Sequence, residues 1–272
     1  MKETPFSNPE RLLSGVGHAL DVLELLALRR EELGLGEIAR SLGLSKAGAH
    51  RLLATLSARG YADRLSGGFY RLGLKAWEIG NAVPELEVLA VAVPFVTDLA
   101  EATDESAFIG TLSGQDVVVL QSVETTQPVR AHLEVGSRYP AHWASTGLVI
   151  LAFLSEGELA EHLPATLSVS TEATIASHEA LRKELVKVRN RGYALNVGTW
   201  KSEISGIAAP IFGADGRIAA GLCISGPRYR LPLPRLQKIA RDAKDIADRI
   251  SAAMRDGKPS RQGQFPIRKA QR

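Results

Sequence analysis

Basic and small side chains gather on one side of the stretch GLSKAGAHRLLATLSARG, which runs from Gly43 to Gly60. Leucines and alanines recur three to four positions apart on the other side. This spacing predicts a helix from Ser45 to about Arg59 that packs one side into a core. The major groove of B-DNA admits one α-helix, and basic side chains pair with its phosphates and guanines. The candidate DNA-binding residues of this helix are Ser45, Lys46, Ala47, Gly48, His50, Arg51 and Thr55.

Two further arginines, Arg64 and Arg71, flank the glycine turn SGG at residues 66–68. The flanking stretches YADRL and FYRL are typical of two short strands around such a turn. An arginine on this hairpin suits a phosphate or the minor groove, although an exposed arginine also serves solubility alone. The basic side of the predicted helix has the same alternative to DNA binding, in which it is only a solvated surface. The preceding helix, the glycine turn and the following hairpin together favour DNA.

A second set of polar residues lies within apolar stretches of the C-terminal half. His142 stands three residues before Ser145, which raises the possibility of a small-molecule hydrolase with a Ser/His site. The sequence contains no G-x-S-x-G elbow and no P-loop, and HEALR at His178 is not H-E-x-x-H. Cys223 is the only cysteine, so an intramolecular disulfide and a CxxC metal site are excluded. We predict no catalytic residues, no metal and no cofactor, and the hydrolase remains the alternative.

The N-terminal elements that must position the basic helix are short. Helical spacing extends from Val16 to Arg30, and a second short helix is predicted from Glu37 to Leu42. Gly43 follows it as a residue that tolerates positive φ. Three helices followed by a hairpin predict a winged helix-turn-helix over residues 1–80, which includes the start of a linker helix. The predicted buried face of the first helix consists of Val16, Leu20, Leu23, Leu26 and Ala27.

Residues 81–256 mix strand-like and helix-like stretches, and the turn GADG before Arg217 is typical of a hairpin. Locally pairing strands with helices around them predict an α+β domain with an antiparallel sheet. Residues 257–272 are basic and contain Pro and Gly, which is typical of a disordered tail. The predicted strands are Ser106–Leu112, Asp116–Val123, Val129–Leu133, Ile204–Phe212 and Arg217–Ser225. The predicted helices are Gly147–Leu154, His178–Arg191 and Leu233–Met254.

The bulk composition is that of an ordinary globular protein. The chain has 272 residues, of which 45% are hydrophobic and 23% charged, enough for about two domains. A net charge of +3 permits nucleic-acid binding without arguing for it. The N-terminal MKETPFSNPERLL does not resemble a secretory signal, and the longest apolar runs are too short to span a bilayer. We therefore expect a cytoplasmic protein without a membrane partner.

Over residues 11–255 the sequence resembles the IclR family of transcriptional regulators. In the N-terminal half the resemblance rests on EIARSLGLSKAGAHRLLATL, GYADR and FYRLGLKAWEIGN. In the C-terminal half it rests on VGSRYPAHWASTGLVILAFL, VRNRGYALNVG, SGIAAPIF and AAGLCISGPRYRL. The resemblance implies a winged helix-turn-helix, a linker helix and a GAF-like effector-binding domain. It also implies a homodimer, or a dimer of dimers, bound to a palindromic double-stranded operator as repressor or activator.

The resemblance further implies an effector pocket in the C-terminal domain. Leu148 stands where the family commonly has a lysine, the run from Asn196 to Trp200 lacks the usual acidic residues, and Ala47–Gly48 replaces a Ser/Thr pair. A helix that starts after Ser145–Thr146 would offer N–H groups to a carboxylate, which favours a small organic acid, aromatic acids included. In the alternative, Ser145 merely caps its helix and side chains fill the cavity. The candidate effector-binding residues are Ser145, Thr146, Asn196, Ile204, Gly206, Cys223 and Ser225.

Overall fold

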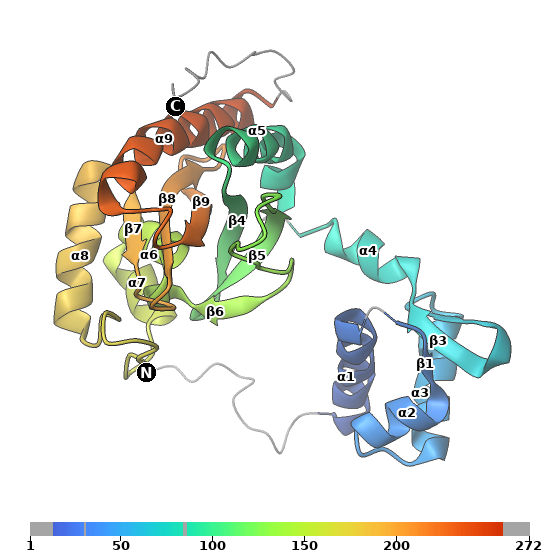
Figure 1. Cartoon of the computed structure of the whole chain (residues 1–272). Helices are drawn as coiled ribbons and strands as arrows, with labels where there is room; N and C mark the ends of the chain where they lie inside the picture. The colour runs from blue at the N-terminus through green and yellow to red at the C-terminus, as the bar shows by residue number, and fades with distance from the viewer. Residues whose placement is uncertain (1–12, 30, 84–85, 258–272) are drawn as a thin grey trace. The chain divides into compact units, whose positions relative to one another are not determined.

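The computed structural model describes residues 13–29, 31–83 and 86–257 (Figure 1). The chain forms two compact units, of which the first ends at residue 84 and the second begins at residue 85. Each unit has its own hydrophobic core. Apart from Gly257, the predicted basic tail of residues 257–272 lies outside the described residues.

The described part of the N-terminal unit is a helix-turn-helix followed by a wing. Strand β3 lies between β1 and β2 and runs antiparallel to both. The three helices and the hairpin are confirmed, whereas β1 was not predicted because two residues are too few to show alternation. The elements are α1 (Ser14–Arg29), β1 (Leu33–Gly34), α2 (Leu35–Ser41), α3 (Lys46–Ala58), β2 (Ala62–Arg64), β3 (Phe69–Leu72) and α4 (Leu74–Gly80).

The predicted buried face of helix α1 is right only in part, since Leu26 is buried and Leu23 packs against the core. Val22 and Leu26 are buried, whereas Val16 and Leu20 are more than half exposed and Ala27 is exposed as well. Apolar residues lie on more than one side of α1, so periodicity alone could not select the buried side. The contacts of α1 with α3 and β3 select it instead.

The C-terminal unit is built on a six-stranded antiparallel sheet in the order β6-β5-β4-β9-β8-β7 (Figure 1). Helices lie on both sides of the sheet, which confirms the α+β class. The final hairpin β8–β9 turns through Gly216 at a φ of 77°. The elements are α5 (Glu87–Thr103), β4 (Ser106–Ser113), β5 (Asp116–Val123), β6 (Arg138–Pro140), α6 (Ser145–Ala152), α7 (Glu156–His162), α8 (His178–Arg191), β7 (Ala194–Val197), β8 (Ile204–Phe212), β9 (Ile218–Pro227) and α9 (Leu233–Asp256).

The two faces of this sheet carry separate cores because successive strand residues point to opposite sides. One face packs against α5 and α9 through Ile109, Ile207 and Ile224. The other face packs against α6 and α8 through Phe108 and Cys223. All eight residues of α6 are buried, so the helix lies wholly inside the unit. The face that carries Cys223 and is covered by α6 is called the α6 face below.

The predicted strand Val129–Leu133 is wrong. This segment has no strand assignment, and the strand that pairs with β5 on the side away from β4 is β6, further along the chain. Side-chain bonds hold the segment instead: Glu124 pairs with Arg130 and with His132, each at 2.5 Å. The Nη2 group of Arg230 donates to the Val129 carbonyl at 2.8 Å. The alternating polar residues of VRAHL therefore bond through their side chains to Glu124, and the backbone does not pair as a strand.

Candidate DNA-binding face and effector site

The start of α3 is fixed by a side-chain cap. The Gly48 N–H donates to Ser45 Oγ at 3.0 Å, and the preceding turn passes through Gly43 at a φ of 64°. A Cβ at Gly48 would lie 3.0 Å from Ser45 Oγ, so this glycine keeps room for the cap as well as for an approaching groove. The predicted helix start is therefore confirmed.

The two sides of α3 differ as the sequence indicated. Ala49, Leu53 and Leu56 are buried in the core of the unit. The hydroxyl of Thr55 donates to the Arg51 carbonyl at 2.9 Å, so a DNA contact by Thr55 would use its oxygen as acceptor. The candidate residues Ser45, Lys46, Ala47, His50, Arg51 and Thr55 are exposed, and Gly48 is half-buried.

Both candidate arginines of the wing are exposed to solvent, but Arg71 is engaged in an ion pair within the hairpin. Arg71 lies directly opposite Asp63 across the hairpin, and its Nε donates to Asp63 Oδ2 at 3.2 Å. Arg64 is exposed on the neighbouring strand, beside a tip in which Gly67 and Gly68 have positive φ. Part of the Arg71 charge is therefore neutralised within the wing, and Arg64 presents the stronger positive charge.

The candidate effector residues of the sheet meet on the α6 face. Asn196 pairs with Gly206 across β7 and β8, and Gly206 pairs with Ser225 across β8 and β9. Cys223 lies two residues before Ser225 and so points to the same side. A Cβ at Gly206 would lie 2.8 Å from the Ile224 carbonyl, so the close approach of β8 and β9 requires glycine there. The structure thus brings together four residues that are up to 29 positions apart in the sequence.

Helix α6 places Ser145 and Thr146 against this row. The Ser145 hydroxyl lies 3.7 Å from the Cys223 thiol, and Thr146 lies close enough to Cys223 and to the buried Tyr139 to have a lowering effect on the pKa of both groups. Burial raises the pKa of the Cys223 thiol above its ordinary value, and the nearby Thr146 and Ser145 hydroxyls only partly offset this effect. Burial also raises the pKa of the Tyr139 phenol, and the nearby thiol adds to this shift.

The helix begins at Ser145, two residues earlier than the predicted start at Gly147. Ala144 is the N-cap of α6 and provides no side-chain cap, so Ser145 is the first helical residue and does not cap the helix. The part of the alternative in which Ser145 caps its helix is therefore wrong. The other part, in which side chains fill the space, agrees with the almost complete burial of Ser145 and Thr146. The Ser145 hydroxyl points to the sheet, where Cys223 lies.

The other polar groups of the row are bonded to the surrounding backbone. Asn196 Oδ1 accepts from the Thr199 N–H at 2.8 Å, and the Ser225 hydroxyl donates to the Ser205 carbonyl at 3.3 Å. The hydroxyl of Thr199 lies 2.7 Å from the Trp143 carbonyl. Five of these side chains are almost fully buried, and we call them the polar cluster: Ser145, Thr146, Asn196, Cys223 and Ser225.

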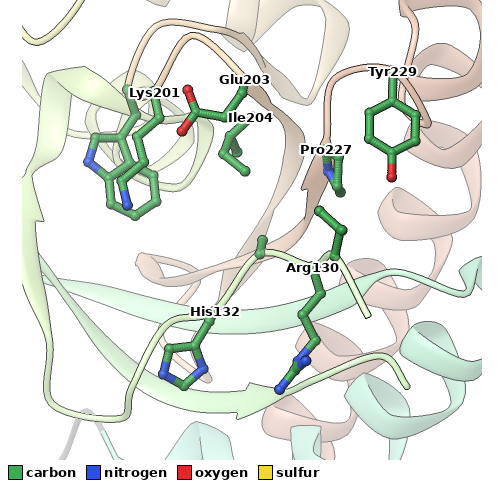
Figure 2. A pocket seen from close by; sticks show the side chains of 10 residues that line it. Arg130, His132, Lys201, Glu203, Ile204, Pro227 and Tyr229 are labelled. Atoms are coloured by element: carbon green, nitrogen blue, oxygen red, sulfur yellow. The ribbon is translucent and has the colours of Figure 1, made fainter. Parts of the chain in front are cut away.

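A surface pocket of about 430 Å³ lies beside the polar cluster. Of the candidate effector residues only Ile204 lines it; the five of the polar cluster and Gly206 do not. Figure 2 shows Arg130 and His132 on one side, Lys201 and Glu203 on the opposite side, and Tyr229 at one end. The full lining is Val129, Arg130, Ala131, His132, Trp200, Lys201, Glu203, Ile204, Pro227 and Tyr229.

Most of this lining was not predicted from the sequence, although Trp200 was noted near the site. The spacing of Glu124, Arg130 and His132 was a usable signal, because one carboxylate with two basic partners favours an ordered loop. Trp143, the other tryptophan noted there, does not line the pocket. Its indole N–H donates to the Ser168 carbonyl at 3.0 Å.

The geometry does not support a hydrolytic site. His142 is buried with its Nε2 2.8 Å from the Ser168 carbonyl, while the Ser145 hydroxyl contacts Cys223. A serine nucleophile needs a base within hydrogen-bond reach. Within residues 13–29, 31–83 and 86–257, no group of three or more His, Cys, Asp or Glu side chains could hold a metal ion. No helix in those ranges has the length and apolar character needed to cross a membrane.

Comparison with known proteins assigns both units. Residues 15–66 match the family described as the IclR helix-turn-helix domain. Residues 80–252 match the family described as bacterial transcriptional regulator IclR C-terminal. Similar proteins include the HTH-type transcriptional regulator XynR of Escherichia coli, 33% identical over 79% of this chain and 86% of that protein. BhcR of Paracoccus denitrificans is 34% identical over 89% of this chain and 88% of that protein.

Solved structures show the same architecture. The Thermotoga maritima IclR crystal structure is 26% identical, with a TM-score of 0.73 over 89% of this chain and 99% of that chain. An IclR homologue from Microbacterium hydrocarbonoxydans, crystallised with 4-hydroxybenzoate, is also 26% identical. Its TM-score is 0.76 over 88% of this chain and 99% of that chain.

Proposed function

This chain belongs to the IclR family of bacterial transcriptional regulators, and we propose that it binds a palindromic DNA operator under the control of a small organic acid. The observation that carries the proposal is α3, a capped helix with one buried side and one exposed basic side. It follows α2 through a tight glycine turn and is followed by an arginine-bearing wing. This is the order of elements in which a helix enters the major groove.

Within this proposal the first turns of α3 meet base edges. Ala47 and Gly48 are small, so the helix backbone can approach the groove floor closely. Arg51 is placed to pair with a guanine or a phosphate, and Ser45 with the helix N-terminus suits a phosphate. Arg64 is the main wing contact, because Asp63 already engages Arg71.

We propose a homodimer, or a dimer of dimers, as the DNA-binding form. Two copies are needed to read two half-sites, which in helix-turn-helix dimers lie about 34–36 Å apart or a multiple of that distance. Large apolar side chains exposed in the N-terminal unit support such a contact, since extended exposed apolar surface marks interfaces. They are Leu13, Val16, Leu20, Leu28, Phe69, Leu74, Trp77, Ile79 and Val83.

The effector site of this proposal is the polar cluster, with Gly206 and Ile204 as its walls. The first N–H groups of α6 and the hydroxyls of Ser145 and Ser225 suit a carboxylate. The relative that was crystallised with 4-hydroxybenzoate supports an aromatic acid as effector. The acid must bind one arrangement of the oligomer better than another, because equal affinity for both would shift nothing.

The proposed protein is a cytoplasmic regulator and not an enzyme, and it needs no metal or cofactor. His142 and Ser145 bond to different partners, which argues against the hydrolase alternative. The relatives named above are regulators as well. An assay with simple esters and amides separates the two, since a hydrolase turns them over.

The decisive experiment is selection of binding sites from a random duplex pool, followed by affinity measurements at several salt concentrations. A regulator enriches one palindromic sequence and binds it far more tightly than unrelated DNA. Enrichment of no sequence would contradict the proposal. Calorimetric titration of small carboxylates against the wild type and Ser225→Val tests the effector site. Full affinity in the variant would show that the site is misplaced.

A further inference from the structure

Trp200 lies between the surface pocket and the polar cluster. Its side chain lines the pocket, and its ring stacks on Tyr139 with centroids 5.1 Å apart and planes at 26°. Tyr139 is buried in the same core as Cys223, and Thr146 of the polar cluster lies near enough to affect the pKa of the Tyr139 phenol. The indole therefore contacts the pocket on one side and the inner wall of the cluster on the other.

The pocket floor continues into the polar cluster along β8 and β9. Ile204 pairs with Pro227 in the pocket, and the next pair on the same face is Gly206 with Ser225. One further step along the hairpin brings Cys223. Strand residues on one face repeat about every 7 Å, so Cys223 lies about 14 Å inward from Pro227. A small molecule that enters the pocket is thus two such steps from the thiol.

The backbone around Trp200 is held separately from its side chain. Carbonyls of three successive residues, 198–200, accept from the hydroxyls of Thr171, Thr174 and Ser170, each at 2.6 Å. The indole itself contacts the Tyr139 ring and the Lys201 ammonium, whose Nζ lies 4.8 Å from the ring centroid. The side chain can therefore rotate out while the three backbone bonds stay intact.

Building on the proposed regulator function, we propose that Trp200 is the gate and the specificity-determining residue of the effector site. A ligand passes from the surface pocket to the polar cluster by displacing the indole from Tyr139. The class of ligand that fits is a planar aromatic carboxylate. Its ring replaces the indole on Tyr139, so the stacking contact is kept, whereas an aliphatic acid leaves the tyrosine ring uncovered.

The charges around the gate fit the acid end of such a ligand. Displacement of the indole separates it from Lys201, whose ammonium then becomes available to a carboxylate at the pocket side. At the inner end, a carboxylate would have to replace the contact of the Ser145 hydroxyl with Cys223 and the bond from Ser225 to the Ser205 carbonyl. Arg130 and His132 share Glu124, which neutralises much of the charge on the opposite wall.

Cys223 provides a direct test because it is the only cysteine of the chain and lies behind the gate. Alkylation by iodoacetamide, followed by mass spectrometry, measures how often the path opens. Trp200→Ala should raise the rate by about tenfold or more, whereas Trp200→Phe, which keeps a ring on Tyr139, should stay near the wild type. Trp143→Phe is the matched control, since Trp143 packs against the same core outside the pocket.

One further variant and one further solution condition make the result decisive. Ile204→Phe narrows the pocket and should slow the alkylation if the pocket is the route. Low concentrations of urea distinguish gate opening from global unfolding, because only global unfolding accelerates steeply with urea. An unchanged rate in Trp200→Ala, or rates that follow global unfolding in every variant, would overturn the gate.

The ligand class is tested in the same assay with benzoate and 4-hydroxybenzoate, and with hexanoate and benzamide as controls. At millimolar concentration the aromatic acids should slow the alkylation of wild-type Cys223, while the aliphatic acid and the neutral amide should not. Equal protection by hexanoate, or no protection by either aromatic acid, would overturn the assignment. Operator binding by the same preparations is measured in parallel, so failure of the gate is distinguishable from failure of the regulator function.

Discussion

The carboxylate of Glu105 and the guanidinium of Arg230 form a two-point ion pair in the C-terminal unit, with both N–O distances at 2.8 Å. The Glu105 side chain has no exposed surface, and that of Arg230 is 19% exposed. Arg230 also donates to the Val129 carbonyl in the pocket wall, and Glu105 lies two residues after the end of α5 and directly before β4. One buried pair thus ties the pocket wall to the junction between α5 and β4.

Removal of one member of this pair should strongly destabilise the C-terminal unit. Glu105→Gln leaves the Arg230 charge without its partner in a buried setting, which typically costs about 3–5 kcal/mol. Chemical denaturation measures the change in the free energy of unfolding. The control is Glu179→Gln, which breaks the exposed pair with Lys183 and should cost less than about 1 kcal/mol. Similar losses in the two variants would contradict the structural role of the buried pair.

Two glycines in neighbouring helices should respond in opposite ways to alanine. A Cβ at Gly147 in α6 would overlap the Ala141 backbone carbonyl, so Gly147→Ala should lower stability by about 1–3 kcal/mol or more. Gly157 in α7 has open space around it, and Gly157→Ala should raise stability by about 0.4–1 kcal/mol through the unfolded state. Thermal denaturation of the two variants checks both signs at once.

Arg51 should contribute to DNA affinity, and Arg59 at the other end of α3 provides the matched control. Arg51→Ala should weaken specific binding by about 1–3 kcal/mol if the side chain reads a base. If it contacts phosphate alone, binding weakens on every sequence and the salt slope falls by about one. Anisotropy titrations at several salt concentrations separate the two outcomes. The assignment of the α3 face would be disproved if Arg51→Ala showed neither effect, or if Arg59→Ala showed equal effects.

Stability should fall at alkaline pH because of Cys223 and Tyr139. Burial raises both folded-state pKa values above the ordinary values of 9.0 and 10.0. The contribution of each group to the free energy of unfolding is therefore complete below its ordinary pKa, which applies in the unfolded chain. It is lost as the pH rises from that value towards the folded-state pKa. In this window each group lowers the free energy of unfolding by about 1.4 kcal/mol per pH unit. Tyr139→Phe should show a flatter decline above 10.0, and a slope equal to that of the wild type would refute the prediction.

Polar substitutions on the exposed apolar surface of the N-terminal unit should weaken self-association. Trp77 is 66% exposed, and Trp77→Gln should raise the dissociation constant of the oligomer by about tenfold or more. Val186→Gln, at a 57% exposed position on α8, is the control and should leave association unchanged. Sedimentation equilibrium measures both. A wild type that is monomeric at high concentration would show that the apolar surface has another role.

The sequence predicted elements whose signals are local. Ser45 and the leucine spacing after it were sufficient to predict α3, because a cap and its apolar side lie within one stretch. The buried face of α1 was predicted only in part: Leu26 was included correctly, but Val16 and Leu20 recur at the same helical spacing and are exposed. Which side of α1 is buried depends on where α3 and β3 pack.

Features of the site that depend on distant residues were beyond sequence reasoning. Glu105 and Arg230 are 125 positions apart, and nothing near either residue indicates the pair. Trp200 was noted from the sequence, but its stacking on Tyr139 requires the folded sheet. The alternation at Val129–Leu133 indicated a strand because periodicity cannot distinguish a backbone ladder from side-chain ion pairs.

The position of β9 between β4 and β8 has a consequence for biosynthesis. The sheet stays incomplete until the hairpin ending at Pro227 has left the ribosome, whereas the N-terminal unit needs nothing beyond residue 84. At typical elongation rates of 5–20 residues per second, roughly 7–30 s separate the two events. During that interval the N-terminal unit has been synthesised in full while the C-terminal sheet still lacks the complete β8–β9 hairpin, so the chain has no complete effector domain.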